Sequence, residues 1–163
     1  MASLGVLFAI DDATTTALLD AEDDDERMAV IERIEEAWDK RYLAELDKAW
    51  DALHRLLSDG TLDVTAGTPP LNRAILGGKH LYEDDDYIIV FVDKARVREV
   101  AAALAQLDDA AVAARYDQLV PRDYAPEYGD EDRTYTVENF RAAAALYARA
   151  AEAGRAVIFT AGQ

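Results

Sequence analysis

The stretch Tyr87-Ile-Ile-Val-Phe-Val92 is the strongest strand signal in the sequence. A strand with one solvated face alternates apolar and polar residues, whereas this one is apolar throughout, so we expect it to be buried on both faces of a sheet. Asp93 follows at once and is a favourable N-cap for a helix that we expect to continue through Leu107. A buried central strand followed directly by a helix indicates a sheet covered by helices.

Working outward, the chain offers further strands near both of its ends and helices between them. Strands are expected over residues 3–10, 79–82 and 155–160. Helices are expected over 14–21, from Asp24 or Asp25 to about Lys40, over 46–58, over 108–118 and over 136–154. The pattern predicts an α+β fold: a single compact domain over residues 1–163, with a small mixed sheet packed with several helices.

The charge balance limits the classes of partner. The chain has 17 Lys and Arg against 33 Asp and Glu, a formal net charge of -16. DNA, RNA and anionic lipid surfaces repel such a chain, so we expect no nucleic acid and no membrane as partners. A basic protein would be attracted, although an acidic surface also serves simply to keep a protein in solution. The runs at 23–25, 83–86 and 127–132 lack the ligand spacing of a calcium loop and are expected to be solvated.

Cysteine content and targeting signals indicate a cytoplasmic protein. The sequence has no cysteine, which removes disulfides and thiol nucleophiles and suits a reducing compartment. Residues 4–10 are apolar but have no basic segment before them, and acidic residues follow at once, unlike a signal peptide. No run approaches the roughly 20 apolar residues that span a bilayer.

Several blocks of sequence carry a family resemblance. The most specific is Leu46-Asp-Lys-Ala-Trp50 with Leu53-His54 and Leu56-Leu57; others are Pro70-Leu71 with Ile75-Leu76-Gly77-Gly78, and Ala114-Arg-Tyr-Asp117. With these blocks the chain resembles the YfbM-like family, small bacterial proteins of unknown function. The resemblance implies a globular, soluble protein and supplies no catalytic residue. The family often has histidine where this chain has Asp51, so a role that needs a histidine pair is not implied.

His54 is the main candidate for chemistry. On the helix expected over 46–58, Asp47, Asp51 and His54 form a stripe beside the apolar face that holds Trp50. A neighbouring carboxylate would fix the imidazole tautomer and raise its pKa toward neutrality, as a general base needs. The alternative is structural: Asp47 begins the helix, and His54 packs at the boundary between core and solvent. We assign no catalytic residue; the candidates in an enzyme would be His54, Asp51 and Asp47.

Metal and cofactor signals are weak. His80 could face His54 across a cleft and hold a metal with Asp51, but no zinc-site spacing is present, so no metal is expected. Gly77-Gly78-Lys79 lacks the spacing of a phosphate-binding loop, and neither a dinucleotide fingerprint nor a hydrolase elbow occurs. We therefore expect no cofactor.

Residues 119–135 lack periodicity and are expected to form a long loop. Tyr124, Tyr128 and Tyr135 lie there among acidic residues and would suit a basic partner, or would pack the loop onto the domain. With Trp50 and His54 they are the expected binding residues. The favoured function is a non-enzymatic, acidic protein-binding module of inhibitor or immunity type. The alternatives are a small-molecule binder or small enzyme that uses His54 and Asp51, and a homo-oligomer formed through an apolar helix face; the oligomeric state stays open.

Overall fold

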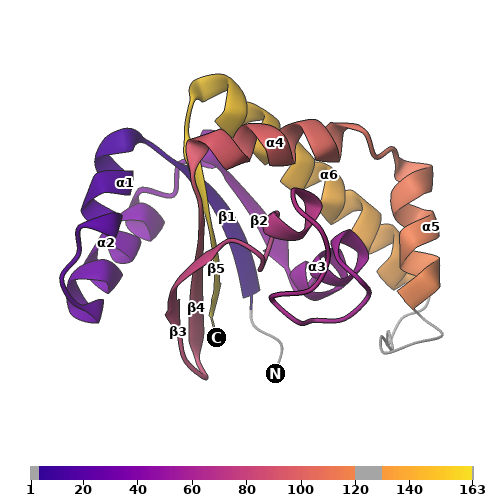
Figure 1. Ribbon diagram of the computed structural model, residues 1–163, viewed down its shortest axis with the longest axis horizontal. Helices are drawn as coiled ribbons and strands as arrows, with labels where there is room; N and C mark the ends of the chain where they lie inside the picture. Colours follow the sequence, from indigo (N-terminus) through magenta and orange to yellow (C-terminus); the bar gives the residue numbers. More distant parts are fainter. Residues whose placement is uncertain (1–3, 120–129, 163) are drawn as a thin grey trace.

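A five-stranded sheet forms the centre of the protein in a computed structural model that describes residues 4–119 and 130–162 (Figure 1). The strands are β1 (Leu4–Ile10), β2 (Leu43–Asp47), β3 (Lys79–Glu83), β4 (Tyr87–Val92) and β5 (Ala156–Gly162). Their order is β2-β1-β5-β4-β3, so the two terminal strands and the strongest strand of the sequence occupy the interior of the sheet. The expected α+β class is confirmed.

Each pairing in this sheet is antiparallel, which corrects the expectation of a mixed sheet. The chain leaves β4 into α4 (Lys94–Ala105), continues through α5 (Asp109–Leu119), and returns along α6 (Asp130–Ala153). Figure 1 shows that α6 brings the chain back to the end of the sheet where β4 stops. β5 therefore begins at the end of the sheet where β4 stops and runs antiparallel to it.

Helices cover both faces of the sheet (Figure 1). One core lies between the sheet and α3 (Trp50–Leu57), α4, α5 and α6; the other lies between the sheet and α1 (Asp12–Leu19) and α2 (Asp24–Ala37). β4 contributes Val90 and Val92 to the first core and Ile89 and Phe91 to the second. This division explains why the strand is apolar at every position.

Aspartates begin several of the helices. The carboxylates of Asp11, Asp23 and Asp93 accept hydrogen bonds from backbone N–H groups in the first turns of α1, α2 and α4. Asp93 is the residue expected from the sequence. For α2 the expected caps, Asp24 and Asp25, are wrong by one and two residues: both lie inside the first turn, where the helix dipole also favours negative charge.

The helix expected over 46–58 is a strand followed by a shorter helix. Leu46 and Asp47 end β2, and α3 begins only at Trp50. Ala44 and Leu46 are both buried in the first core, the two-residue repeat of a strand, and Gly5 of β1 pairs with Asp47. Asp47 has φ 50, so the chain turns sharply between the two elements.

The last helix begins earlier than expected. α6 starts at Asp130 rather than at 136, with Asp130, Glu131 and Asp132 in its first turn, where acidic residues are favoured. Tyr135 is therefore helical and not part of a loop. Tyr124 and Tyr128 lie outside the described residues. No described helix combines the length and apolar character that a membrane crossing requires.

Candidate functional site

The side chain of His54 is sealed in the first core, with 0% of its surface exposed. It lies on α3 between Leu53 and the buried pair Leu56 and Leu57. The expected position at the boundary between core and solvent is therefore wrong. The wheel places His54 beside Leu53 and Leu57, but it cannot show that the loop carrying Asp63 packs over the ring and excludes solvent.

The hydrogen bonding of the ring fixes which nitrogen carries the proton of the neutral imidazole. The Nε2 atom lies 3.0 Å from the backbone carbonyl oxygen of Asp63, which can only accept, so Nε2 carries the proton and donates. Nδ1 is then an acceptor, and it has no hydrogen-bond partner among the described residues. Burial lowers the pKa of His54 from its ordinary value of 6.5, outweighing the opposing effects of the Asp63 carbonyl and the Asp51 charge. The ring is held neutral, opposite to the rise in pKa expected beside a carboxylate.

The two aspartates expected to serve His54 have other partners. The carboxylate of Asp51 accepts from the Nε of Arg55 at 2.6 Å, one helical turn further along α3. Asp47 lies at the end of β2, beside the hydroxyl of Tyr135, which accepts a hydrogen bond from the backbone N–H of Lys48 at 3.2 Å. The structure thus brings Asp47 together with Tyr135, two residues that the sequence placed in different sites. Their contact fastens the turn between β2 and α3 to α6.

Trp50 packs on the sheet. Its ring centroid lies 5.7 Å from that of Phe159, and a Cβ atom at Gly5 would come within 2.6 Å of the indole Cδ1. Glycine at position 5 therefore makes room for the indole ring. In this position Trp50 contributes chiefly to the packing between α3 and strands β1 and β5.

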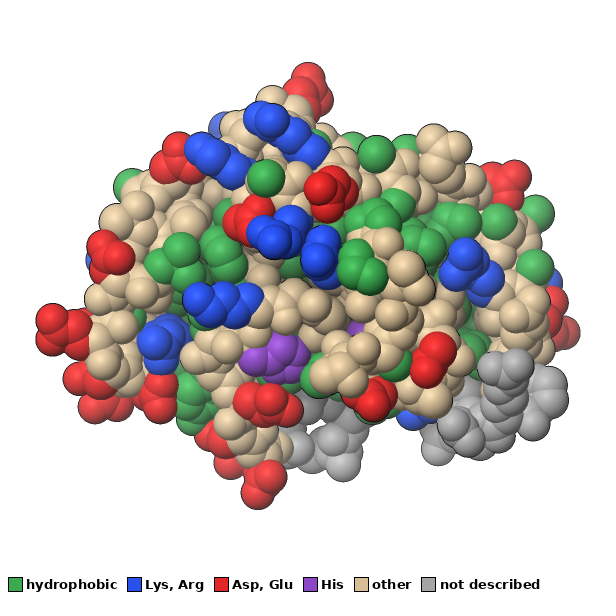
Figure 2. Space-filling view, viewed as in Figure 1, with side chains coloured by type: hydrophobic (Ala, Val, Ile, Leu, Met, Phe, Trp, Pro, Cys, Tyr) green, Lys and Arg blue, Asp and Glu red, His purple; other side chains and the backbone are tan. Residues whose placement is uncertain are grey.

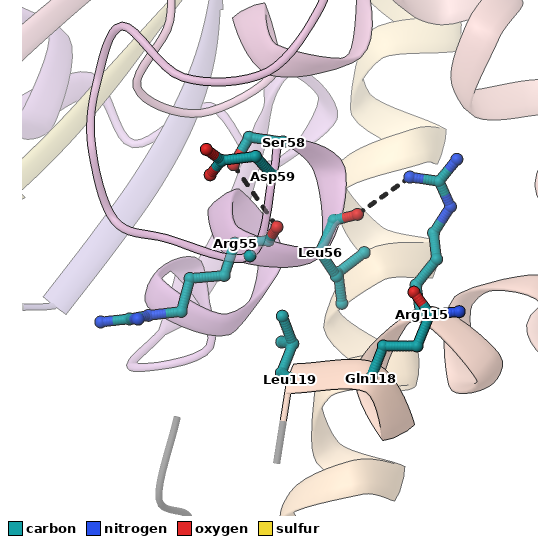
Figure 3. Close-up of a pocket in the computed structure, with 8 residues that line it drawn as sticks. Arg55, Leu56, Ser58, Asp59, Arg115, Gln118 and Leu119 are labelled. Atoms are coloured by element: carbon teal, nitrogen blue, oxygen red, sulfur yellow. Dashed lines mark hydrogen bonds between the residues drawn. The ribbon is translucent and has the colours of Figure 1, made fainter. Parts of the chain in front are cut away.

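A pocket of about 330 Å³ lies where the end of α3 meets α5 (Figure 3). Its residues come from the last turn of α3, the turn after it and the last turn of α5: Arg55, Leu56, Ser58, Asp59, Gly60, Arg115, Gln118 and Leu119. In Figure 3 the guanidinium of Arg115 points to the backbone carbonyl of Leu56, to which its Nη1 donates at 3.0 Å. A cation at this place satisfies a carbonyl that the helix itself leaves unpaired and complements the negative end of the helix dipole.

The pocket therefore resembles a braced helix end more than a reaction centre. Ser58 donates its hydroxyl proton to the backbone carbonyl of His54 at 2.7 Å, and Asp59 accepts from the backbone N–H and the hydroxyl of Thr61. These bonds hold the start of the loop that carries Asp63. His54 and this loop form one structural unit, because the buried imidazole donates a hydrogen bond to the backbone carbonyl of Asp63 in the loop.

His80 has its own partners. Its Nε2 lies 2.7 Å from the backbone carbonyl of Leu76 and its Nδ1 lies 3.2 Å from the carboxylate of Glu83. Over residues 4–119 and 130–162, no group of three or more histidine, aspartate or glutamate side chains is arranged to hold a metal ion.

A surface on the other side of the sheet was not among the sites expected from the sequence. Exposed carboxylates line α2, the segment before it and the turn between β3 and β4; we name this set the acidic surface: Glu22, Asp23, Asp24, Asp25, Glu26, Glu32, Glu35, Glu36, Glu83, Asp84, Asp85 and Asp86. The Tyr87 hydroxyl donates to Glu35 at 2.8 Å, which joins the strand end to α2. Figure 2 shows red side chains gathered along this edge of the molecule. The runs were visible in the sequence, but only the fold shows that segments 50 residues apart share one surface.

Two tyrosines stand within the acidic surface. Tyr82 and Tyr87 are half-buried, with ring centroids 6.5 Å apart, and the Tyr82 hydroxyl donates to Asp84. Burial, together with the bond to Glu35, raises the pKa of Tyr87 well above its ordinary value of 10.0, so the phenol stays protonated and keeps donating. These rigid aromatic groups were not among the expected binding tyrosines.

Comparison with known proteins agrees with the resemblance seen in the sequence. A family model described as a domain of unknown function, DUF1877, matches residues 1–160. Among solved structures, the protein of unknown function YfbM from Escherichia coli superposes with a TM-score of 0.68 at 19% identity, covering 97% of this chain and 99% of that one. At this identity the likeness shows a shared fold. The search of curated proteins found no match. Because the family model spans nearly the whole chain, the protein belongs to the DUF1877 family, and it has the fold of YfbM.

Proposed function

We propose that this protein is a non-enzymatic binding module of inhibitor or immunity type, whose acidic surface covers a basic protein partner. The observation that carries the proposal is the gathering of exposed carboxylates from α2 and the β3–β4 turn on one side of the sheet. Charges of one sign concentrated on one surface attract a partner of opposite sign and speed its association.

The carboxylates of this surface differ in how far they are engaged within the protein. Asp23, Asp24 and Asp84 cap a helix, pair with an arginine or close a turn. Glu32, Glu36 and Asp85 enter no ion pair with another described residue. The second group remains available to a partner and adds like-charge repulsion in the free protein, which binding a basic surface would relieve.

Aromatic groups strengthen the same surface. Tyr82 and Tyr87 offer contact area at little entropic cost, because their rings are already packed and their hydroxyls already bonded. Tyrosine is enriched at protein interfaces for this reason. Tyr124 and Tyr128 remain predicted binding residues, whereas the contact of Tyr135 with Lys48 gives it a role in the fold.

The test is affinity capture from host lysate at low and high salt, with two variants of equal charge. Glu32→Gln with Asp85→Asn removes two carboxylates from the acidic surface; Glu138→Gln with Glu152→Gln removes two exposed carboxylates from α6. We expect one basic protein to be retained at low salt, lost at high salt, and lost from the first variant but not from the second, because charge-steered contacts are local and screened. Equal capture by both variants, or no specific capture by the native protein, would contradict the proposal.

A further inference from the structure

A groove runs between α1 and α2, on the side of the molecule that carries the acidic surface. Two hollows lie along it, of about 270 Å³ and about 600 Å³, and both are lined by Ala17, Val30 and Arg33. Because the two hollows share these residues, they adjoin each other along the pair of helices, and we treat them as one groove. The helices are consecutive in the chain and joined by residues 20–23.

Small and apolar residues form the floor of this groove. α1 contributes Ala13 and Ala17, and α2 contributes Ala29, Val30 and Ile34. Ala13 and Ala17 are four residues apart, so they lie one turn apart on the same face of α1. Alanine at both places leaves holes that larger side chains at the same i, i+4 spacing on another helix would fill.

The rim of the groove is acidic. Glu26, Glu32 and Glu36 line the larger hollow, all three are exposed, and all three belong to the acidic surface. Arg33 is the opposing charge, and its exposed side chain forms no ion pair with another described residue. The arginine stem can cover apolar surface while its guanidinium stays in water, so the rim keeps a net negative charge.

We infer that this groove is the docking site for an amphipathic, cationic helix of the basic partner. Apolar residues at i and i+4 of that helix would enter the holes beside Ala13 and Ala17, and lysine or arginine on its flanks would face Glu26, Glu32 and Glu36. A helix of about 12 residues, roughly 18 Å long, would span the lining residues from Glu26 to Glu36, which lie about 15 Å apart along α2. The inference rests on the proposed function and specifies which part of the acidic surface makes the apolar contact.

A helix fits the groove better than an extended segment does. Two helices side by side present ridges and grooves that a third helix can pack into, as in a three-helix bundle. An extended segment would instead pair with a free strand edge, and the edge strand on this side, β3, lies outside the groove. Substitutions in the groove therefore discriminate between the two modes of binding.

The probe is a synthetic 12-residue peptide with leucine along one helical face and lysine on the others. Its binding to the protein is measured by the fluorescence anisotropy of the labelled peptide. The control peptide has the same composition in scrambled order, so its leucines surround the helix. We expect the amphipathic peptide to bind at least about 10-fold more tightly than the scrambled one, because only its leucines can enter the floor together.

Variants of the protein test the floor and the rim separately. Ala17→Leu fills the floor and should weaken amphipathic-peptide binding by about 10-fold, while Ala102→Leu, an exposed alanine on α4, should leave it unchanged. Ala13→Leu serves the same purpose if thermal melting shows Ala17→Leu to be poorly folded. Glu32→Gln should weaken binding about 2- to 3-fold, whereas Arg33→Gln should strengthen it by a similar factor, since it removes a like charge. A purely structural effect would not give opposite signs at neighbouring positions.

The outcomes separate this inference from the function on which it rests. If both peptides bind equally, Ala17→Leu has no effect, and binding still disappears at high salt, the groove is excluded and a charge-driven role of the acidic surface stands. If the amphipathic peptide binds and the expected losses occur, but no basic protein is captured from lysate, the groove is supported and the proposed partner is not. If neither peptide binds even at low salt, the groove is excluded.

Discussion

The surroundings of His54 and the acidic surface contrast in what the sequence leads one to expect. The first holds the residue types of acid–base chemistry, yet the imidazole is wholly buried and bonded to a backbone carbonyl. The second reads as ordinary solvated charge, yet the fold collects it on one surface beside two packed tyrosines and an apolar groove. Reactive residue types indicate a site only where they are accessible, and accessibility depends on tertiary packing.

The two regions also differ in role: the surroundings of His54 stabilise the fold, and the acidic surface is proposed to bind a partner. The core around α3 holds the loop of residues 59–70 in place through His54, Ser58 and Asn72, whose side-chain amide donates to Ala66. On the acidic surface, repulsion between like charges lowers the stability of the folded protein, and several carboxylates remain available to a partner. Substitutions should therefore separate stability from binding: those near His54 should change the first, and those on the acidic surface the second.

The largest effect is expected for His54→Ala. Removing a fully buried ring leaves a cavity and an unpaired carbonyl at Asp63, so the free energy of unfolding should fall by about 2–4 kcal/mol. Denaturant unfolding measures this free energy, at a protein concentration where folding is reversible.

The control for this experiment is His80→Ala, since that ring is only partly buried. We expect a smaller loss of stability from it. Partner capture should survive in His54→Ala below its unfolding transition. If His54→Ala loses partner capture while its fold is intact, His54 takes part in binding, and the division between a structural and a binding region is wrong.

A smaller loss is expected for Gly5→Ala. Its new Cβ would meet the indole of Trp50 at 2.6 Å and the ring of Phe159 at 2.8 Å, so both rings must shift. Overpacking of this kind costs about 1–3 kcal/mol. The change should also alter tryptophan fluorescence in the native state: of the two tryptophans, Trp50 meets the new Cβ, whereas Trp38 packs against Phe8. Unchanged stability and fluorescence would mean that Trp50 is free to move away from the sheet, as a binding residue would be.

The sequence predicted those parts of the fold whose signals are local. Strand β4, its cap Asp93 and the α+β class follow from apolar runs and capping preferences. The boundary at Leu46 could not be found in this way, because over five residues the repeats of a strand and a helix overlap and pairing with β1 decides between them. The acidic surface depends on contacts between distant segments, such as Tyr87 with Glu35, which no local pattern encodes. The groove depends on how the consecutive helices α1 and α2 pack against each other.

The pH dependence of stability tests the protonation state of His54. Burial puts its folded-state pKa below the ordinary 6.5, so the unfolded chain takes up a proton more readily as the pH falls past that value. The stability contributed by the neutral ring is complete above pH 6.5 and is lost below it. Between about pH 7 and about pH 5 the native protein should lose stability relative to His54→Gln, which cannot titrate there.

The difference between the two proteins is the quantity to follow. Loss of negative charge on acidification stabilises both, because the chain carries a net charge of -16, and the exposed carboxylates contribute equally to each. Asp51 and Asp59 oppose the shift of the His54 pKa and Arg55 supports it, but burial is the larger effect. A difference that is constant over this range would mean that His54 is accessible to water and protons, contrary to the sealed core.

The smallest effect on stability should come from the acidic surface itself. Glu32→Gln with Asp85→Asn alters exposed side chains that pair with no other described residue, so the Tm should change by less than about 2 °C, with a slight rise if relief of repulsion dominates. The same variant should show the greatest loss of partner capture. Thermal melting and capture on one preparation give both quantities. If these substitutions lower the Tm as much as Gly5→Ala does, the carboxylates stabilise the fold, and the division of work between the two regions is wrong.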